Sequence, residues 1–406
     1  MNEKKQILEG SNAIAQVIKT IAPDVISAYP ITPQTHIVED LAKFKADGES
    51  DYEFVRAESE FAAASIVAGA SAAGARVYTA TSSQGLLLMT EVVYNIAGMR
   101  LPVVMTCANR AVSAPINIWN DQQDVHAVTH AGWIMFFAEN HQEAVDQHVM
   151  AFKIAEQLKI PVMINVDGFV LTHTYEPVII PSAEKIKKYL PSYKPKIGEY
   201  LDPKNPVTLG AFATPADYME IREDLHNDLM DSKEVILREY EQFKKIFKMS
   251  DNKRQVTVAL AKKIKGIFDN GLLEYYGPSN AKTVLVAMGS VVGTVKDVAD
   301  EVNKKSLFPG GKIGVLKIKT FRPFPEKEIA QILSKAKHIA VIDKAISLGH
   351  AGPLAMEVKS TLQGKTMANV RSFVLGLGGR DISKEMIGRV IKDMKQKENK
   401  VKFIGR

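Results

Sequence analysis

The sequence contains one cysteine, no long apolar run and no block of charges of one sign. The single thiol, Cys107, excludes internal disulfides, a cysteine-held iron–sulfur cluster and a Cys-based zinc site. It lies in the apolar run Leu101–Cys107, which predicts a buried strand and a small core side chain rather than a catalytic thiol. No apolar run approaches the roughly 18 residues that a membrane helix needs. The charged start Met1–Lys5 lacks the apolar segment of a secretory signal, which predicts a cytoplasmic protein without membrane contact.

The composition is that of an ordinary globular protein. Hydrophobic residues make up 46% of the 406 residues and charged residues 24%, so disorder is not indicated. The net charge of +6 is spread along the chain without a basic, aromatic-interleaved stripe, so we expect no nucleic-acid partner. The length allows two or three domains.

Residues 1–180 alternate short β-rich runs with helical patterns. This alternation predicts βαβ units, and hence a mainly parallel sheet covered by helices on both faces. The predicted strands are Asp24–Ala28, Phe54–Arg56, Arg76–Thr81, Leu101–Cys107 and Pro161–Val166, and the predicted helices are Gln34–Phe44, Glu58–Gly74, Gly85–Gly98 and Gln142–Leu158.

The rest of the chain predicts a connector and a second α/β domain. Residues 181–280 are rich in Lys, Pro and Tyr at first, and then show the apolar spacing of a long amphipathic helix around Tyr218–Leu229. Residues 281–406 again alternate. Their predicted strands are Thr283–Met288, Lys312–Ile318 and His338–Ile342, with helices over Thr294–Val302 and Glu326–Lys335.

Five polar, turn-rich segments fall at the ends of the predicted strands of residues 1–180. In open α/β sheets the loops at the carboxyl ends of strands bind ligands, so five such segments in one domain predict a binding site. They are Tyr29–Thr35, Arg56–Glu60, Thr79–Gly85, the segment from Asn109 to Asp124, and Asp167–Gly168.

Two of these segments carry hydroxyl and carboxylate groups suited to a site. Thr32 stands between Pro30 and Pro33, which restrict the loop; a rigid turn before a capped helix explains the same pattern. Glu60 and Glu58 lie in the first turn of an alanine-rich helix. One carboxylate there suits the helix dipole, whereas two suggest that one of them exchanges a proton in the site.

Arg110 follows a predicted buried strand. Its planar guanidinium can bind a substrate carboxylate, and a structural ion pair with Asp121 or Asp124 is nearly as good an explanation.

Three weaker patterns predict no separate site. His126 and His130 lack the Glu and the helix of a metal motif, so no metal site is predicted in this chain. Gly289–Thr294 lacks the Lys of a phosphate loop, and Gly376–Gly379 lacks the third spaced glycine of a dinucleotide motif. Both are expected to be turns.

Taken together, nine segments resemble pyruvate:ferredoxin oxidoreductases, a 2-oxoacid:ferredoxin oxidoreductase family, in their order and spacing. The likeness covers nearly the whole chain and fits the α subunit of the four-subunit type. The segments are Gly10–Ala15, Tyr29–Thr35, Glu58–Glu60, Gly74–Gly85, Asn109–Pro115, Asn117–Asp124, Asp167–His173, Thr320–Pro325 and Gly376–Asp381.

The resemblance implies roles for particular residues. Residues 1–180 would be a domain that binds the pyrimidine ring of thiamine diphosphate, and residues 281–406 a domain like the C-terminal one of transketolase. Glu60 matches the catalytic carboxylate that hydrogen-bonds the pyrimidine nitrogen, and Thr32 and Arg110 match residues that contact the substrate carboxylate. The cofactor-binding set implied by the likeness is Tyr29, Pro30, Glu60, Ser83 and Gln84.

The resemblance also implies partners. The family's Gly-Asp-Gly signature for diphosphate and Mg²⁺ is missing here, as are cluster cysteines. We therefore expect Mg²⁺ and [4Fe-4S] clusters to reside on β, γ and δ subunits of one complex. That complex would use coenzyme A and ferredoxin, and this chain would be inactive alone.

Pyruvate is the expected substrate, but three residues that depart from the pyruvate-type pattern leave a second substrate class open. Phe61 replaces a usual histidine, and Thr129 and His130 replace an Arg-Asp pair, so a branched-chain or aryl 2-oxoacid such as 2-oxoisovalerate or phenylglyoxylate is the alternative. A transketolase-like transferase would need the missing diphosphate domain in this chain. A non-catalytic α/β scaffold or binding subunit is the remaining alternative.

Overall fold

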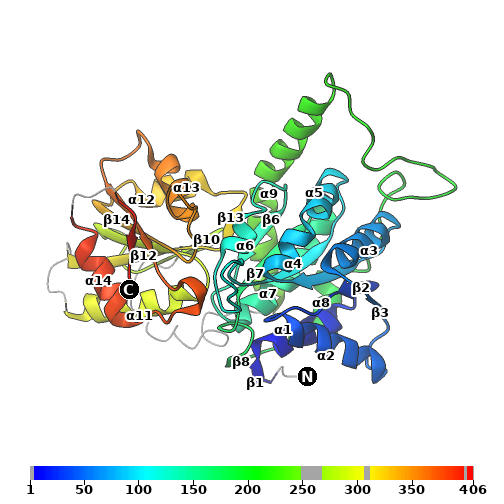
Figure 1. The fold of residues 1–406 in the computed structure, drawn as a ribbon, viewed down its shortest axis with the longest axis horizontal. Coiled ribbons are helices and arrows are strands. Elements are labelled where there is room, and N and C mark those ends of the chain that lie inside the picture. The colour runs from blue at the N-terminus through cyan, green and yellow to red at the C-terminus, as the bar shows by residue number, and fades with distance from the viewer. Residues whose placement is uncertain (1–3, 248–267, 306–310, 397–399, 406) are drawn as a thin grey trace.

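The computed structural model describes residues 4–247, 268–305, 311–396 and 400–405, so part of the predicted connector, 248–267, lies outside the described residues. Two seven-stranded sheets with helices on both faces form two α/β units that lie side by side (Figure 1). The predicted fold class is confirmed.

The first sheet holds the candidate site. Its strand order is β13-β6-β7-β5-β4-β2-β3, and all pairs are parallel except β13–β6. The inner strands β4, β5 and β7 are buried at every residue, as expected of parallel strands covered on both sides. The strands are β2 (Val25–Ala28), β3 (Glu53–Arg56), β4 (Val77–Thr81), β5 (Val104–Asn109), β6 (Ile134–Phe137), β7 (Val162–Asp167) and β13 (Thr320–Arg322).

Two groups of helices cover this sheet on opposite faces (Figure 1). One group is α1 (Gly10–Ile21), α2 (Thr35–Ala46) and α7 (His141–Leu158); the other is α3 (Glu60–Ala72), α4 (Ser83–Leu88) and α5 (Thr90–Gly98). The predicted helix Gly85–Gly98 is thus two helices, which meet at Met89. A separate two-stranded sheet of β1 (Gln6–Glu9) and β8 (Tyr175–Val178) lies beside α1.

The second sheet has the order β16-β15-β14-β11-β12-β10-β9, and it starts before residue 281 because β9 and β10 belong to it. Helices α11 (Val291–Lys305) and α14 (Lys384–Asp393) contact each other, as do α12 (Glu326–Leu333) and α13 (Pro353–Leu362). The strands are β9 (Phe268–Asp269), β10 (Leu273–Tyr276), β11 (Thr283–Ala287), β12 (Ile313–Ile318), β14 (His338–Asp343), β15 (Asn369–Val374) and β16 (Lys402–Phe403).

Between the units run α8 (Ala183–Tyr189) and the long helix α9 (Tyr218–Phe247), which packs on α7 and projects away from the body at its other end (Figure 1). None of the described helices combines the length and the apolar composition of a membrane crossing.

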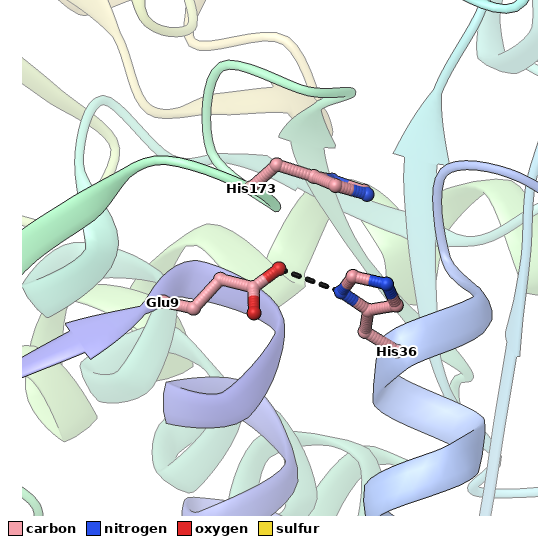
Figure 2. A group of neighbouring side chains, drawn as sticks. All are labelled: Glu9, His36 and His173. Atoms are coloured by element: carbon pink, nitrogen blue, oxygen red, sulfur yellow. Dashed lines mark hydrogen bonds and ion pairs between the residues drawn. The ribbon is translucent and has the colours of Figure 1, made fainter.

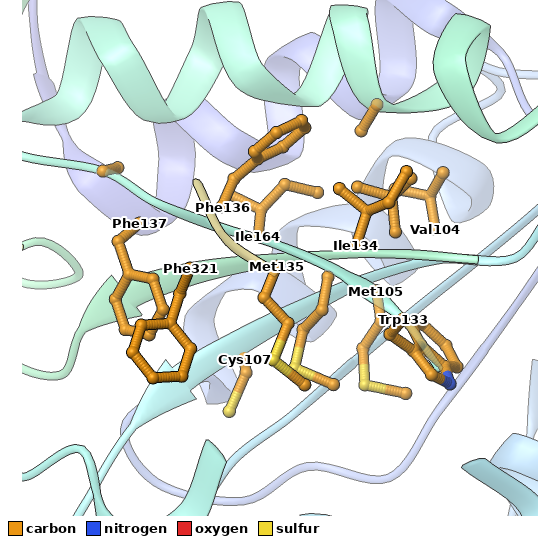
Figure 3. Packing of buried hydrophobic residues seen from close by; sticks show 14 of the residues in the cluster. Val104, Met105, Cys107, Trp133, Ile134, Met135, Phe136, Phe137, Ile164 and Phe321 are labelled. Carbon is orange, nitrogen blue, oxygen red and sulfur yellow. The ribbon is translucent and has the colours of Figure 1, made fainter. Parts of the chain in front are cut away.

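Apolar packing and buried ion pairs join the two units. The chain leaves the second sheet at β12 and at once adds β13 to the first sheet, where Phe321 packs edge-on against Phe137 (Figure 3). Beside it, Lys317 Nζ lies 2.7 Å from carboxylate oxygens of both Glu139 and Glu143. Cys107 is buried in this core, as predicted (Figure 3).

Candidate active site

The strand order predicts where a ligand binds. The chain passes from β2 outward to β3 and then returns across β2 to β4, so the connections diverge between β2 and β4. In doubly wound sheets the crevice at such a switch point is the ligand site, because the loops on either side turn away from each other. The loops that begin here are Tyr29–Thr35, after β2, and Ser82–Gly85, after β4.

The loop after β2 is held in place by a buried amide. Gln34 is fully buried, and its Nε2 donates to the carbonyl oxygens of Tyr29, at 3.1 Å, and Ala80, at 2.7 Å. These bonds fasten the loop to the end of β4. Tyr29 and Pro30 remain exposed at the mouth of the crevice.

Glu60 points into the crevice from the first turn of α3. Ser59 caps the helix by accepting the Ala62 N–H at 3.1 Å. Glu60, the carboxylate that the resemblance selects, is buried, while Glu58 is exposed. A Cβ on Gly85 would stand 2.7 Å from Glu60 Oε1, so only glycine lets α4 approach this carboxylate so closely.

Polar atoms without partners surround Glu60. Thr81 Oγ1, Ser82 Oγ and Gln84 Nε2 are buried and have no hydrogen-bond partner among the described residues. Buried polar groups of this kind are normally satisfied, so several at one place indicate a polar ligand. A buried carboxylate, free hydroxyls and an amide fit the ring nitrogens and amino group of an aminopyrimidine.

Asp124 organises the strand ends and was considered in the sequence only as an ion-pair partner. Its buried carboxylate accepts the backbone N–H groups of Ser83, at 3.0 Å, and Arg110, at 2.9 Å, and Nδ2 of Asn109, at 3.1 Å. Burial raises the pKa of this carboxyl to about 6, although the hydrogen bonds that it accepts act to lower the pKa. Asp124 thereby joins the loops after β4 and β5. The only sequence signal was its place at the end of the Asn117–Asp124 segment.

Arg110 and Thr32, the two predicted substrate-binding residues, lie in contact. Arg110 Nη1 donates to the Thr32 carbonyl oxygen at 2.9 Å, and Nε donates to the Asn117 carbonyl oxygen at 3.1 Å. Within the described residues the guanidinium forms no ion pair with Asp121 or Asp124, so the structural salt bridge considered above is absent there. A mostly buried guanidinium held by neutral carbonyls keeps its charge available to an anion.

The second unit closes one side of the site. Asp167, at the end of β7, accepts the Ser290 N–H at 2.8 Å and forms an ion pair of 3.0 Å with Lys344. The next residue, Gly168, leaves no space for a Cβ, which would stand 2.7 Å from Pro33. The turn after β7 therefore rests directly on the loop that carries Thr32.

The weaker sequence patterns have structural roles. His126 is packed between Phe137 and Phe321, and burial lowers its pKa to about 3. Gly378 and Gly379 allow close contact with Asn117 and Trp119. Among the described residues the groups that could hold a metal lie elsewhere, at Glu9, His36 and His173, which the sequence did not single out (Figure 2).

Two protein-family profiles match this chain. Residues 16–242 match the family described as "Pyruvate flavodoxin/ferredoxin oxidoreductase, thiamine diP-bdg", and residues 281–387 match "Pyruvate:ferredoxin oxidoreductase core domain II". The first match includes the predicted site residues Tyr29, Pro30, Thr32, Glu60, Ser83, Gln84 and Arg110.

Curated relatives match over nearly their full length. The chain is 46% identical to pyruvate synthase subunit PorA of Methanocaldococcus jannaschii, over 97% of this chain and 96% of that one. It is 39% identical to ketoisovalerate oxidoreductase subunit VorA of Pyrococcus horikoshii, over 97% of this chain and 95% of that one.

A solved structure shares the fold. The 2-oxoglutarate:ferredoxin oxidoreductase of Magnetococcus marinus aligns with 97% of this chain at a TM-score of 0.71 and 18% identity, and this chain spans 66% of that longer one.

Proposed function

The chain belongs to the pyruvate flavodoxin/ferredoxin oxidoreductase family, and we propose that it is the α subunit of a thiamine-diphosphate-dependent pyruvate synthase. It is an oxidoreductase subunit of the 2-oxoacid:ferredoxin type. The observation that supports the proposal best is the buried Glu60 carboxylate at the β2–β4 switch point, pressed against Gly85 and surrounded by unpartnered polar atoms.

In this proposal Glu60 holds the pyrimidine. Thiamine diphosphate, when bound, supplies the carbon nucleophile that adds to the oxo group and carries the charge left by loss of carbon dioxide. The Glu60 carboxyl would donate its proton to the pyrimidine ring nitrogen and, as a carboxylate, accept the hydrogen bond of the N–H so formed. Thr81 Oγ1, Ser82 Oγ and Gln84 Nε2 hydrogen-bond the ring's remaining polar atoms, and the buried crevice excludes water from them.

Arg110 and Thr32 would bind the substrate. The guanidinium binds the oxoacid carboxylate, and the Thr32 hydroxyl donates to it. The hydrogen bond of 2.9 Å from Arg110 Nη1 to the Thr32 carbonyl oxygen holds the guanidinium in place before the substrate arrives. Substrate binding would therefore cost less conformational entropy at this side chain.

Partner subunits would complete the site. Large apolar side chains are exposed around it: Phe61 and Leu88 next to Glu60 and Gly85, and Trp119 with Ile116, at 79% exposure, on the loop after Arg110. Exposed large apolar side chains on segments that carry a site are typical of surfaces that a partner covers. We propose that a β subunit covers this region and brings Mg²⁺ and the diphosphate-binding residues, while [4Fe-4S] clusters on partner subunits pass electrons to ferredoxin and coenzyme A takes the acyl group.

A panel of 2-oxoacids tests this function. The complex reconstituted from this chain and its partner subunits is supplied with coenzyme A and a one-electron acceptor, and kcat/KM is measured for pyruvate, 2-oxoisovalerate, phenylglyoxylate and 2-oxoglutarate. Pyruvate should give the highest value. No reduction with any oxoacid would reject the proposal.

A branched-chain substrate is the second candidate, since a ketoisovalerate oxidoreductase subunit is among the relatives and Phe61 is apolar. In that case the same panel would give a higher kcat/KM for 2-oxoisovalerate than for pyruvate.

A further inference from the structure

We propose that Glu9, His36 and His173 form a site for a divalent transition-metal ion of the zinc class, separate from the thiamine site. Three distant parts of the chain supply the ligands: Glu9 ends β1, His36 lies in the first turn of α2, and His173 lies in the turn after β7. Figure 2 shows the three side chains gathered at one point.

The geometry suits one ion. The candidate ligand atoms all lie within 4.8 Å of one another, and His36 Nδ1 is 2.7 Å from Glu9 Oε1. Ligand atoms that share a zinc ion at roughly 2.1 Å lie about 3–4 Å apart, so side-chain movements of about 1 Å would bring all three onto it. Two imidazoles and one carboxylate select zinc-class ions over Ca²⁺ or Mg²⁺, which prefer oxygen ligands.

The second ring nitrogen of His173 is already oriented. Its Nδ1 lies 2.7 Å from Thr172 Oγ1, which also accepts the Phe169 N–H at 2.8 Å. A histidine that binds metal through one nitrogen usually donates its other N–H to an oxygen, which fixes the tautomer and the ring plane. In the tautomer in which Nδ1 donates to Thr172, His173 Nε2 is the nitrogen that would bind the ion.

The surroundings favour a cation and allow it to enter. An open pocket of about 410 Å³ adjoins Glu9 and His36 and is also lined by Glu39 and Asp40. These carboxylates attract cations, and the pocket has room for water as a fourth ligand.

A bound ion would act on the loop that carries Thr32. His36 follows that loop directly, and His173 lies in the turn whose Gly168 rests on Pro33. The ion would cross-link β1, α2 and this turn. We therefore expect zinc to stabilise the chain against heat, whatever reaction the complex catalyses.

Zinc and cobalt titrations of the tag-free, metal-stripped full chain test the site. Calorimetry should show one equivalent of Zn²⁺, and Co²⁺ should give the visible absorption of a nitrogen- and oxygen-ligated ion. His173→Ala and Glu9→Gln should each weaken binding at least tenfold, whereas His226→Ala, at an exposed position on α9, should not change it. The proposal would be overturned if Zn²⁺ showed no saturable binding, or if the His173→Ala and Glu9→Gln variants bound it as tightly as the unaltered chain does.

A second measurement needs no variant. Diethyl pyrocarbonate labels accessible imidazoles, and peptide mass spectrometry locates the label. Zn²⁺ should protect His36 and His173 but not His226. Equal labelling of His36 and His173 with and without Zn²⁺ would reject the site even if every variant misfolded.

Discussion

The guanidinium of Arg110 donates to the backbone carbonyl oxygens of Thr32 and Asn117 and forms no ion pair with a carboxylate among the described residues. At the scale of single residues, the guanidinium is therefore held by neutral hydrogen-bond partners, and the nearby carboxylate of Asp124 attracts it without forming an ion pair.

Arg110→Lys should raise the KM for the oxoacid about 10- to 100-fold, because lysine keeps the charge but loses the planar pair of donors. The value of kcat should fall much less. Initial rates of the assembled complex over a range of oxoacid concentrations measure both constants. An unchanged KM would mean that Arg110 only supports the loop.

Asp124 shows what the sequence could not reveal about the site. Asp121 and Asp124 look alike in the sequence, yet Asp124 alone lies where the ends of β4 and β5 turn toward each other and takes the N–H groups of both loops. For Glu60 and Glu58 the resemblance selects Glu60, and the structure buries Glu60 and exposes Glu58. The motifs therefore predict the residue types of the site, whereas the role of Asp124 depends on packing between distant segments.

At the scale of elements, the contact between α3 and α4 determines the space around Glu60. The alanine-rich composition of α3 and the glycine in the first turn of α4 both serve this close approach. Helix α3 turns its small residues Ala63, Ala64 and Ala68 inward and leaves Phe61 and Ser65 exposed on its other face.

Gly85→Ala should lower the affinity of the assembled complex for thiamine diphosphate at least tenfold. Its new Cβ would stand 2.6 Å from Thr81 Oγ1 and 2.7 Å from Glu60 Oε1, which pushes the carboxylate from its place. Cofactor titration monitored by tryptophan fluorescence measures the affinity. Gly98→Ala is the matched control, since a Cβ on Gly98, at the end of α5, meets nothing within 4 Å. Equal affinities in the two variants would contradict the assigned contact.

Most elements could be predicted from local patterns, and the failures have physical causes. The strands β2, β4 and β7 are rich in β-branched and apolar residues, and their predicted bounds agree with the structure within a residue or two. Strand β6 (Ile134–Phe137) was not predicted because its four apolar residues show neither the alternation of a strand nor the spacing of a helix. The break between α4 and α5 at Met89 depends on packing against α3. Pairing of β13 with the first sheet is a long-range contact with no local signal.

At the scale of the whole molecule, a cluster of buried charges joins the two units. Lys317 of the second sheet is almost fully buried and contacts Glu139 and Glu143 of the first unit and Glu274 of β10. Burial alone would raise the pKa of Glu274, but Lys296 and Lys317 outweigh it and hold the pKa at about 2, below its ordinary 4.5. A depressed carboxyl pKa adds stability above about pH 4.5, and this stability is lost as the pH falls toward 2.

Lys317→Met should destabilise the chain by about 3–5 kcal/mol at neutral pH, because it leaves several carboxylates buried without their partner. The variant should also unfold at a higher pH on acidification, since Glu274 loses one of the charges that depress its pKa. Urea unfolding at pH 7 and acid titration followed by circular dichroism measure both effects. Lys337→Met, at an exposed position, should change stability by less than about 0.5 kcal/mol. Similar behaviour of the two variants would contradict the role of the cluster.

The central claim, that the Glu60 carboxylate acts on the thiamine pyrimidine, is tested most directly by hydrogen–deuterium exchange at C2 of the cofactor. Exchange is followed by quenched-flow NMR in the assembled complex for the unaltered chain, Glu60→Gln and the matched Glu58→Gln. The account predicts exchange slowed at least about 100-fold in Glu60→Gln, with Glu58→Gln at the unaltered rate. Exchange in Glu60→Gln as fast as in the unaltered complex would contradict it.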